Sequence, residues 1–154
     1  MALLFYATNY SPARAQAEIQ QSLLGIGARR ISLEYRDKQV VGMSFTLETP
    51  QGEREFLLPA RVERVLDTLK RQGVLRGAGR RPDVAVQHQH AMAVAWRTLL
   101  EWVKVQAAIA ETRQAAADEI MLPYLVLEGD GPGQRITLYE QFSANRALPE
   151  GGRG

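Results

Sequence analysis

The segment HQHAMAVAWRTLLEWVKVQAAIAET, residues 88 to 112, is the part of the chain around which the other elements are expected to pack. It holds both tryptophans of the chain, and its apolar residues recur at steps of three and four, as on one face of an α-helix. A helix that is apolar around so much of its circumference is typical of a buried position. We expect a central helix, covered on one side by the N-terminal part of the chain and on the other by the C-terminal segment or a second subunit. The main face has Met92, Trp96, Leu99, Leu100 and Val103, and a second face has Trp102, Val105 and Ile109.

Upstream of this helix, the sequence predicts a helix and a three-stranded antiparallel meander. An N-cap serine and a first-turn proline open the first helix, which we expect at residues 12 to 24. Apolar and polar residues then alternate over residues 31 to 36 and 41 to 48, the two-residue period of strands. A turn at residues 37 and 38 joins these strands, and residues 53 to 58 predict the third strand.

Parity along the strands predicts what each face of the meander carries. Tyr35 and Phe45 share the face of Leu33 and Met43, so we expect both rings in the core. The other face is polar and partly acidic, which argues against a single strand of nucleic acid stacking across the sheet.

The remaining segments give shorter signals. Pro59 opens a predicted second helix that ends at Gly73, and residues 73 to 87 form a predicted glycine-rich loop. Residues 3 to 6 predict either a short strand or apolar side chains folded back on the core. Residues 136 to 142 fit neither the helical nor the strand period.

These elements predict an α+β protein, with a three-stranded antiparallel meander packed on two helices, a long tryptophan-bearing central helix and a short C-terminal extension. Residues 1 to 142 are expected to form one domain, with a short strand near residues 123 to 129, and residues 143 to 154 a disordered tail.

Composition excludes several classes of protein. With no cysteine, the chain has no disulfide scaffold, thiolate zinc site or cysteine nucleophile. The net charge is only +2, so attraction of a polyanion would depend on local clusters. The apolar runs are too short to cross a bilayer and the start does not read as a signal peptide, so we expect no membrane association and a cytoplasmic location.

The main charged feature is a basic cluster without an acid, at the end of the predicted second helix and in the glycine-rich loop. A loop of this kind can lay guanidinium groups against phosphates, whose counterions are then released. The alternative is solvated surface, in which the first two residues only complement the helix dipole. The predicted nucleic-acid-binding residues are Lys70, Arg71, Arg76, Arg80 and Arg81, with Arg29 and Arg30 as an extension of the patch.

No residue pattern singles out a metal, a cofactor or a catalytic group. His88 and His90 are two residues apart, which on a helix points them about 200° apart and prevents joint chelation. We therefore expect neither metal nor cofactor, and no enzyme activity. A nuclease built from Asp83, Glu101 and Lys104 is a conceivable exception if the central helix exposes those side chains.

Three runs carry a resemblance to other proteins. They are residues 27 to 73, from GARRISLEY to LKRQG, the run VAWRTLLEWVKVQAAIAET and the short LPYL. They resemble small proteins of tailed phages and prophages without an assigned activity. The resemblance implies a role in phage DNA metabolism, host takeover or assembly, in the cytoplasm of a host cell.

The order of elements in residues 11 to 73 also resembles the double-stranded-RNA-binding domain. That family places lysines at the start of its second helix, whereas this chain has Pro59, Ala60, Arg61 and Val62 there. No residue role is carried over from it.

Our sequence-based expectation is a small phage-type accessory protein that binds nucleic acid, with single-stranded DNA ahead of duplexes, by backbone contacts that do not read sequence. We also expect a homodimer through Trp102, Val105 and Ile109, unless residues 120 to 142 cover that face within one chain. The alternative function is a regulator or inhibitor that docks on a host or phage protein without nucleic-acid affinity.

Overall fold

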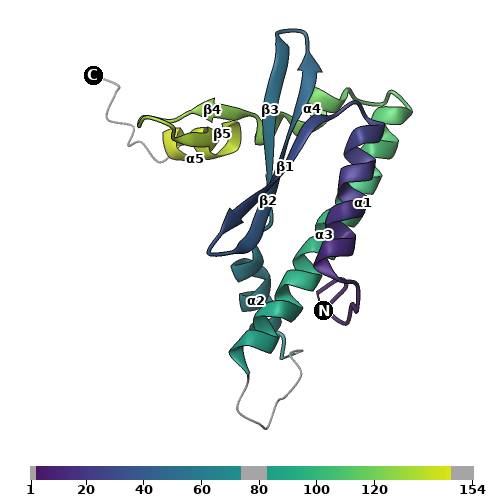
Figure 1. Ribbon diagram of the computed structural model, residues 1–154, viewed down its shortest axis with the longest axis vertical. Helices are drawn as coiled ribbons and strands as arrows, with labels where there is room; N and C mark the ends of the chain where they lie inside the picture. The colour runs from purple at the N-terminus through teal and green to yellow at the C-terminus, as the bar shows by residue number, and fades with distance from the viewer. Residues whose placement is uncertain (1–2, 74–82, 147–154) are drawn as a thin grey trace.

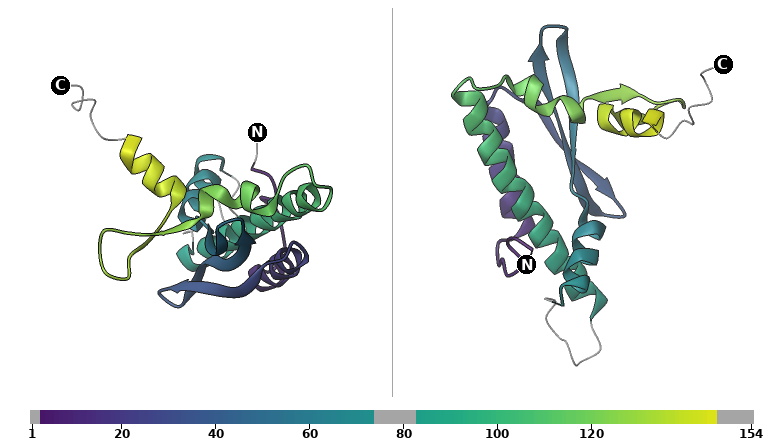
Figure 2. Two further views of the ribbon diagram at one scale, coloured as in Figure 1. Left: turned by 90° about the horizontal axis from the view of Figure 1, so that it is seen from above. Right: turned by 180° about the vertical axis from the view of Figure 1, so that it is seen from behind.

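Helices cover one face of a three-stranded antiparallel sheet in the computed structural model, and a C-terminal segment passes beside β3 and projects on the other side of the sheet (Figures 1 and 2). The structure describes residues 3 to 73 and 83 to 146. The predicted α+β class is confirmed. The elements are α1 (Pro12–Gly25), β1 (Arg29–Arg36), β2 (Gln39–Thr49), β3 (Gly52–Pro59), α2 (Val62–Arg71), α3 (Val84–Glu111), α4 (Ala117–Met121), the 3₁₀ turn η1 (Leu122–Tyr124), β4 (Val126–Glu128), β5 (Arg135–Thr137) and α5 (Leu138–Arg146).

The N-terminal segment folds back on the helices. Residues 4 to 7 form a turn rather than a strand, and the Leu3 amide donates a hydrogen bond to Gln72 Oε1 at 2.6 Å. The first predicted helix is confirmed as α1, whose N-cap Ser11 accepts a hydrogen bond from the Arg14 amide at 3.1 Å.

The sheet has the order β1-β2-β3, as predicted. Arg36 pairs with Gln39, so the first hairpin has a two-residue turn, and both turn residues, Asp37 and Lys38, have positive φ. This is the left-handed geometry that matches the twist of paired strands. On the inner face Phe45 lies opposite Phe56, with stacked rings 5.8 Å apart.

The prediction that Tyr35 lies in the core is wrong. Tyr35 is 64% exposed, whereas Phe45 on the predicted face is fully buried. A register shift between Glu34 and Tyr35 interrupts the ladder there, and the end of the β1–β2 hairpin projects beyond the helices that cover the rest of the sheet (Figures 1 and 2). The shift places Tyr35 opposite Val40, which has the opposite parity to Met43, so the alternation that predicted a buried ring does not continue to Tyr35.

The second helix begins later than predicted. Pro59 is the last residue of β3, and the Ala60 amide still donates to the Val41 carbonyl at 2.9 Å, which keeps the chain extended. The start of α2 is therefore Val62. Its predicted end is confirmed, because Gly73 follows the C-cap with φ of 64°.

The central helix α3 is longer than predicted. Asp83 is its N-cap and accepts a hydrogen bond from the Ala85 amide at 3.0 Å, so residues 84 to 87, predicted as loop, are helical. Trp96, Leu100 and Val103 are fully buried in the core shared with α1, α2 and the inner face of the sheet. Within the described residues, no helix has the length and apolar character required to span a membrane.

After α3 the chain turns back through α4 and η1, where Trp102 packs edge-on against Tyr124 with centroids 5.9 Å apart. The C-terminal segment therefore covers Trp102, as the alternative to a homodimer predicted. Val105, on the same predicted face, remains 57% exposed. A homodimer stays a prediction.

We call β4, β5 and α5, residues 126 to 146, the C-terminal arm. The ambiguous residues 136 to 142 are divided between β5 and α5, because the Thr137 hydroxyl accepts a hydrogen bond from the Glu140 amide and so caps the helix. The prediction that the disordered tail begins at residue 143 is wrong, because α5 continues to Arg146. The rest of the predicted tail, residues 147 to 154, lies outside the described residues.

Candidate nucleic-acid interface

The predicted basic residues do not form one patch. Arg29 opens β1 just after α1 ends and pairs with Thr46, whereas Lys70 and Arg71 end α2, at the opposite end of the molecule (Figure 1). Arg29 and Arg30 therefore do not extend the surface at the end of α2. The predicted residues Arg76, Arg80 and Arg81 lie outside the described residues.

Two of the described basic residues have acidic partners. Arg30 lies 3.6 Å from Glu53, and Arg71 lies 3.3 Å from Asp67, one helical turn before it. Both arginines are largely exposed, and exposed ion pairs of this kind contribute at most about 1 kcal/mol. These pairs would not prevent Arg71 from contacting a phosphate.

Arg61 and Arg64, at the start of α2, are basic residues that the sequence reasoning missed. Both are exposed, and together with Thr68 and Arg71 they follow steps of three, four and three along one side of the helix. The helical spacing that begins at Arg61 is visible in the sequence and could have predicted this basic surface. The basic surface therefore runs along α2 rather than being confined to its end.

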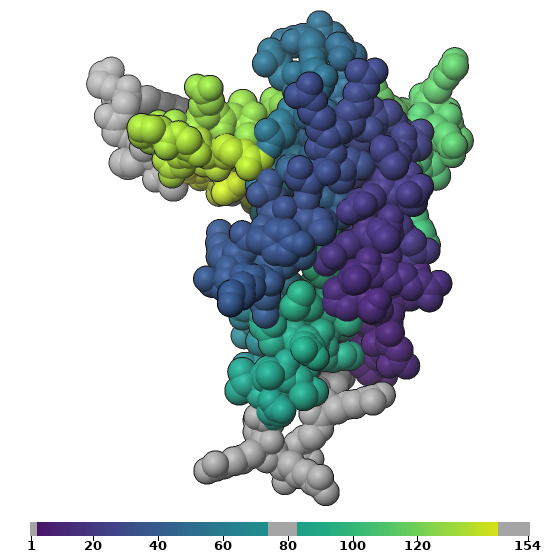
Figure 3. Space-filling model, in the orientation of Figure 1, coloured from purple at the N-terminus to yellow at the C-terminus, as the bar shows by residue number. Residues whose placement is uncertain are grey.

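This side of α2 leads into a groove of about 610 Å³. The β1–β2 hairpin, the start of α2, His88 of α3 and the C-terminal arm contribute to its walls. In Figure 3 the hairpin and the arm project on the same side of the molecule, with a notch between them. The charged residues that line the groove are Glu34, Arg36, Asp37, Arg61, Glu63, Arg64, His88, Arg135 and Glu140.

Most of the acids in the groove are already engaged. Glu34 pairs with Arg135 at 3.3 Å, and Glu63 Oε1 lies 3.2 Å from His88 Nε2. Glu140 accepts hydrogen bonds from the amide and hydroxyl of Thr137 at 3.1 and 3.0 Å. Only Asp37, in the hairpin turn, has no such partner within the described parts of the chain.

Three of the basic residues in the groove are not neutralised in this way. Arg36, Arg61 and Arg64 are exposed and form no ion pair with any other residue that the structure describes. Four arginines and four carboxylates line the groove, so its formal charge is balanced, and Arg36, Arg61 and Arg64 are the arginines available for a ligand.

The two histidines have separate structural contacts. His88 lies against Glu63 of α2, and His90 Nε2 contacts the Tyr6 carbonyl of the N-terminal segment. Across residues 3 to 73 and 83 to 146, no group of three side chains of the types His, Cys, Asp and Glu is placed to hold a metal ion.

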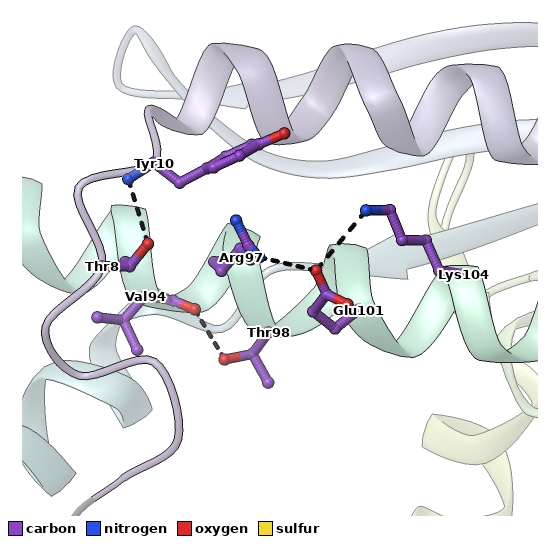
Figure 4. Close-up of polar contacts among 7 residues, drawn as sticks. All are labelled: Thr8, Tyr10, Val94, Arg97, Thr98, Glu101 and Lys104. Atoms are coloured by element: carbon purple, nitrogen blue, oxygen red, sulfur yellow. Dashed lines mark hydrogen bonds and ion pairs between the residues drawn. The ribbon is translucent and has the colours of Figure 1, made fainter.

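The conceivable nuclease residues are not assembled either. Glu101 lies 3.1 Å from Arg97 and 3.7 Å from Lys104 on consecutive turns of α3 (Figure 4). Arg97 in turn stacks on the ring of Tyr10, 4.4 Å from its centroid. Asp83 caps the same helix 18 positions earlier, roughly 27 Å away along its axis. Glu101 therefore helps to hold the N-terminal segment on α3.

The fold and this surface define a small α+β protein with a helix-covered meander and a charged, arginine-lined groove on the side of the arm. No family model matches the chain, and comparisons with curated proteins and with solved structures found no match either.

Proposed function

We propose that this protein is a small nucleic-acid-binding accessory protein that holds single-stranded DNA through its phosphate backbone. The observation that carries the proposal is the row of exposed basic residues on α2, which begins at Arg61 and leads into the acid-free sequence from Lys70 to Arg81. Such a row binds phosphates without reading bases. The choice of single strands over duplexes rests on the resemblance to phage proteins, which implies a role in phage DNA metabolism, host takeover or assembly.

Fluorescence anisotropy tests the proposal with labelled single-stranded DNA, duplex DNA and RNA at about 50 and 200 mM salt. If four or five phosphates are contacted, affinity for single-stranded DNA falls by roughly two orders of magnitude between these salts, from a slope of about −0.7 per phosphate. A variant with Arg76, Arg80 and Arg81 changed to Gln is expected to lose most of this binding.

The structure supplies a matched control for that variant. Arg29, Arg30 and Arg54 lie on the sheet, away from α2, and their change to Gln removes the same charge. This control is expected to bind as the wild type does. Equal losses in the two variants would indicate a general charge effect, and no binding at the lower salt would contradict the proposal.

A second candidate function, docking on a host or phage protein, is favoured by one observation. Tyr139 and Phe142 are three positions apart on α5, hence on one side of the helix, and are 52% and 61% exposed on the projecting arm. A stoichiometric partner recovered from host lysate, insensitive to nuclease and lost on Tyr139→Ser/Phe142→Ser, would favour this function.

A further inference from the structure

We infer that the groove beside α2 receives a nucleotide of the bound single strand, with its base stacked on Tyr35 and its phosphates held by Arg36, Arg61 and Arg64. This inference rests on the proposed function. It names a residue that contacts a base and a path for the bound DNA strand. The basic segment from Lys70 to Arg81 defines neither of these.

The first support is the charge that remains accessible in the groove. Glu34 is paired with Arg135, whereas Glu63 lies against His88 and Glu140 accepts a hydrogen bond from Thr137, contacts that orient these two carboxylates without cancelling their charge. Arg36, Arg61 and Arg64 are free of ion pairs within the described residues and present guanidinium groups, which bind phosphate through paired N–H donors.

The second support is an exposed aromatic residue at the same place. Tyr35 is among the residues that line the groove, and 64% of its surface is exposed although it lies in a strand. Leu57, Pro59 and Val40 add half-buried apolar surface to the lining. An aromatic ring beside unpaired arginines is the combination that single-strand-binding proteins use for stacked bases and their phosphates.

The third support is the size and direction of the groove. Its volume of about 610 Å³ is within the range of sites for small organic ligands, so a single nucleotide unit fits. From the groove, Arg64 and Arg71 continue along one side of α2, which is about 15 Å long. A strand that follows this side reaches the segment that begins at Lys70.

The experiment measures binding of a labelled oligothymidylate to three groove variants as a function of salt. Tyr35→Leu is expected to weaken binding about 5- to 100-fold with an unchanged salt slope, because stacking releases no counterions. Tyr35→Phe keeps the ring and should bind as the wild type does. Arg61→Gln/Arg64→Gln is expected to reduce the magnitude of the slope of log affinity against log salt by about 1.4, because two phosphate contacts are lost.

Tyr139→Leu is the matched control, because Tyr139 is also exposed but does not line the groove. It should bind as the wild type does. An oligomer with abasic sites should bind wild type and Tyr35→Leu equally, because it has no base to stack.

The two proposals fail in different ways. If the wild type binds and the variant at Arg76, Arg80 and Arg81 does not, but Tyr35→Leu binds normally, the groove inference is overturned and the proposed function stands. If the wild type binds no nucleic acid at the lower salt, both are overturned.

Discussion

Arg135 Nη1 lies 3.3 Å from Glu34 Oε1, although the two residues are 101 positions apart in the chain. The same guanidinium also pairs with Glu55. Glu34 belongs to β1 and Glu55 to β3, and both project from the sheet face opposite the core. One arginine therefore fastens the C-terminal arm to the outer face of the sheet by pairing with one acid on each edge strand.

Arg135→Ala is expected to loosen the arm without unfolding the protein. Each partly exposed ion pair contributes roughly 0.2 to 1 kcal/mol, so the arm should open about fivefold more often. Hydrogen exchange of the α5 amides measures this opening. Arg54→Ala is the control, because Arg54 on β3 forms no ion pair within the described residues. Unchanged exchange in Arg135→Ala would disprove the fastening role.

Thr137→Ala is expected to fray α5. The Thr137 hydroxyl accepts a hydrogen bond from the Glu140 amide, and the Glu140 carboxylate accepts one from the Thr137 amide, which together form a capping box. Loss of such a cap costs about 1 kcal/mol. Chymotrypsin should then cleave at Tyr139 and Phe142 several times faster. Thr137→Ser keeps the hydroxyl and should be cleaved at the wild-type rate.

Lys38→Gly is expected to raise the free energy of unfolding by about 1 kcal/mol. Lys38 has φ of 65°, a left-handed conformation in which a Cβ atom is unfavourable and glycine is not. Urea denaturation measures the change. Lys38→Ala removes the charge but keeps the Cβ, so it should give no comparable gain, and equal gains would assign the effect to charge.

Val105→Glu is expected to abolish the predicted homodimer. A buried carboxylate at the centre of an apolar interface is costly, and Val105 is the most exposed of the three residues predicted to form it. Light scattering at high protein concentration measures the mass. Val84→Glu is a matched control, because Val84 is also exposed but lies at the start of α3. A monomeric wild type would refute the predicted association.

The elements with a long regular period could be predicted from sequence. The apolar spacing around Trp96 and the alternation around Phe45 are local patterns with burial on one side, and both were interpreted correctly. Predicted helix boundaries were wrong where a hydrogen bond to a distant part of the chain sets them. The Val41 carbonyl, for example, accepts a hydrogen bond from the Ala60 amide and keeps the chain extended there. The capping box at Thr137 and Glu140 was legible as a T-x-x-E pattern, and it would have resolved the ambiguous residues 136 to 142.

The candidate site was less predictable because it depends on distant contacts. The exposure of Tyr35 goes with the register shift between Glu34 and Tyr35, which no pattern within β1 encodes. The neutralisation of Glu34 depends on Arg135, at the other end of the chain. The basic character of α2 could have been recognised from the spacing of Arg61 and Arg64, but not their place beside a groove.

The packing of Trp102 on Tyr124 gives the protein two separate optical reporters. Trp96 is fully buried in the core, so its emission should change only when the whole fold is lost. Trp102 is half-buried and touches η1, immediately before the arm, so its emission should respond when that turn lifts from α3. A Trp96→Phe protein would thus show movement of the C-terminal segment by fluorescence alone, without any label attached.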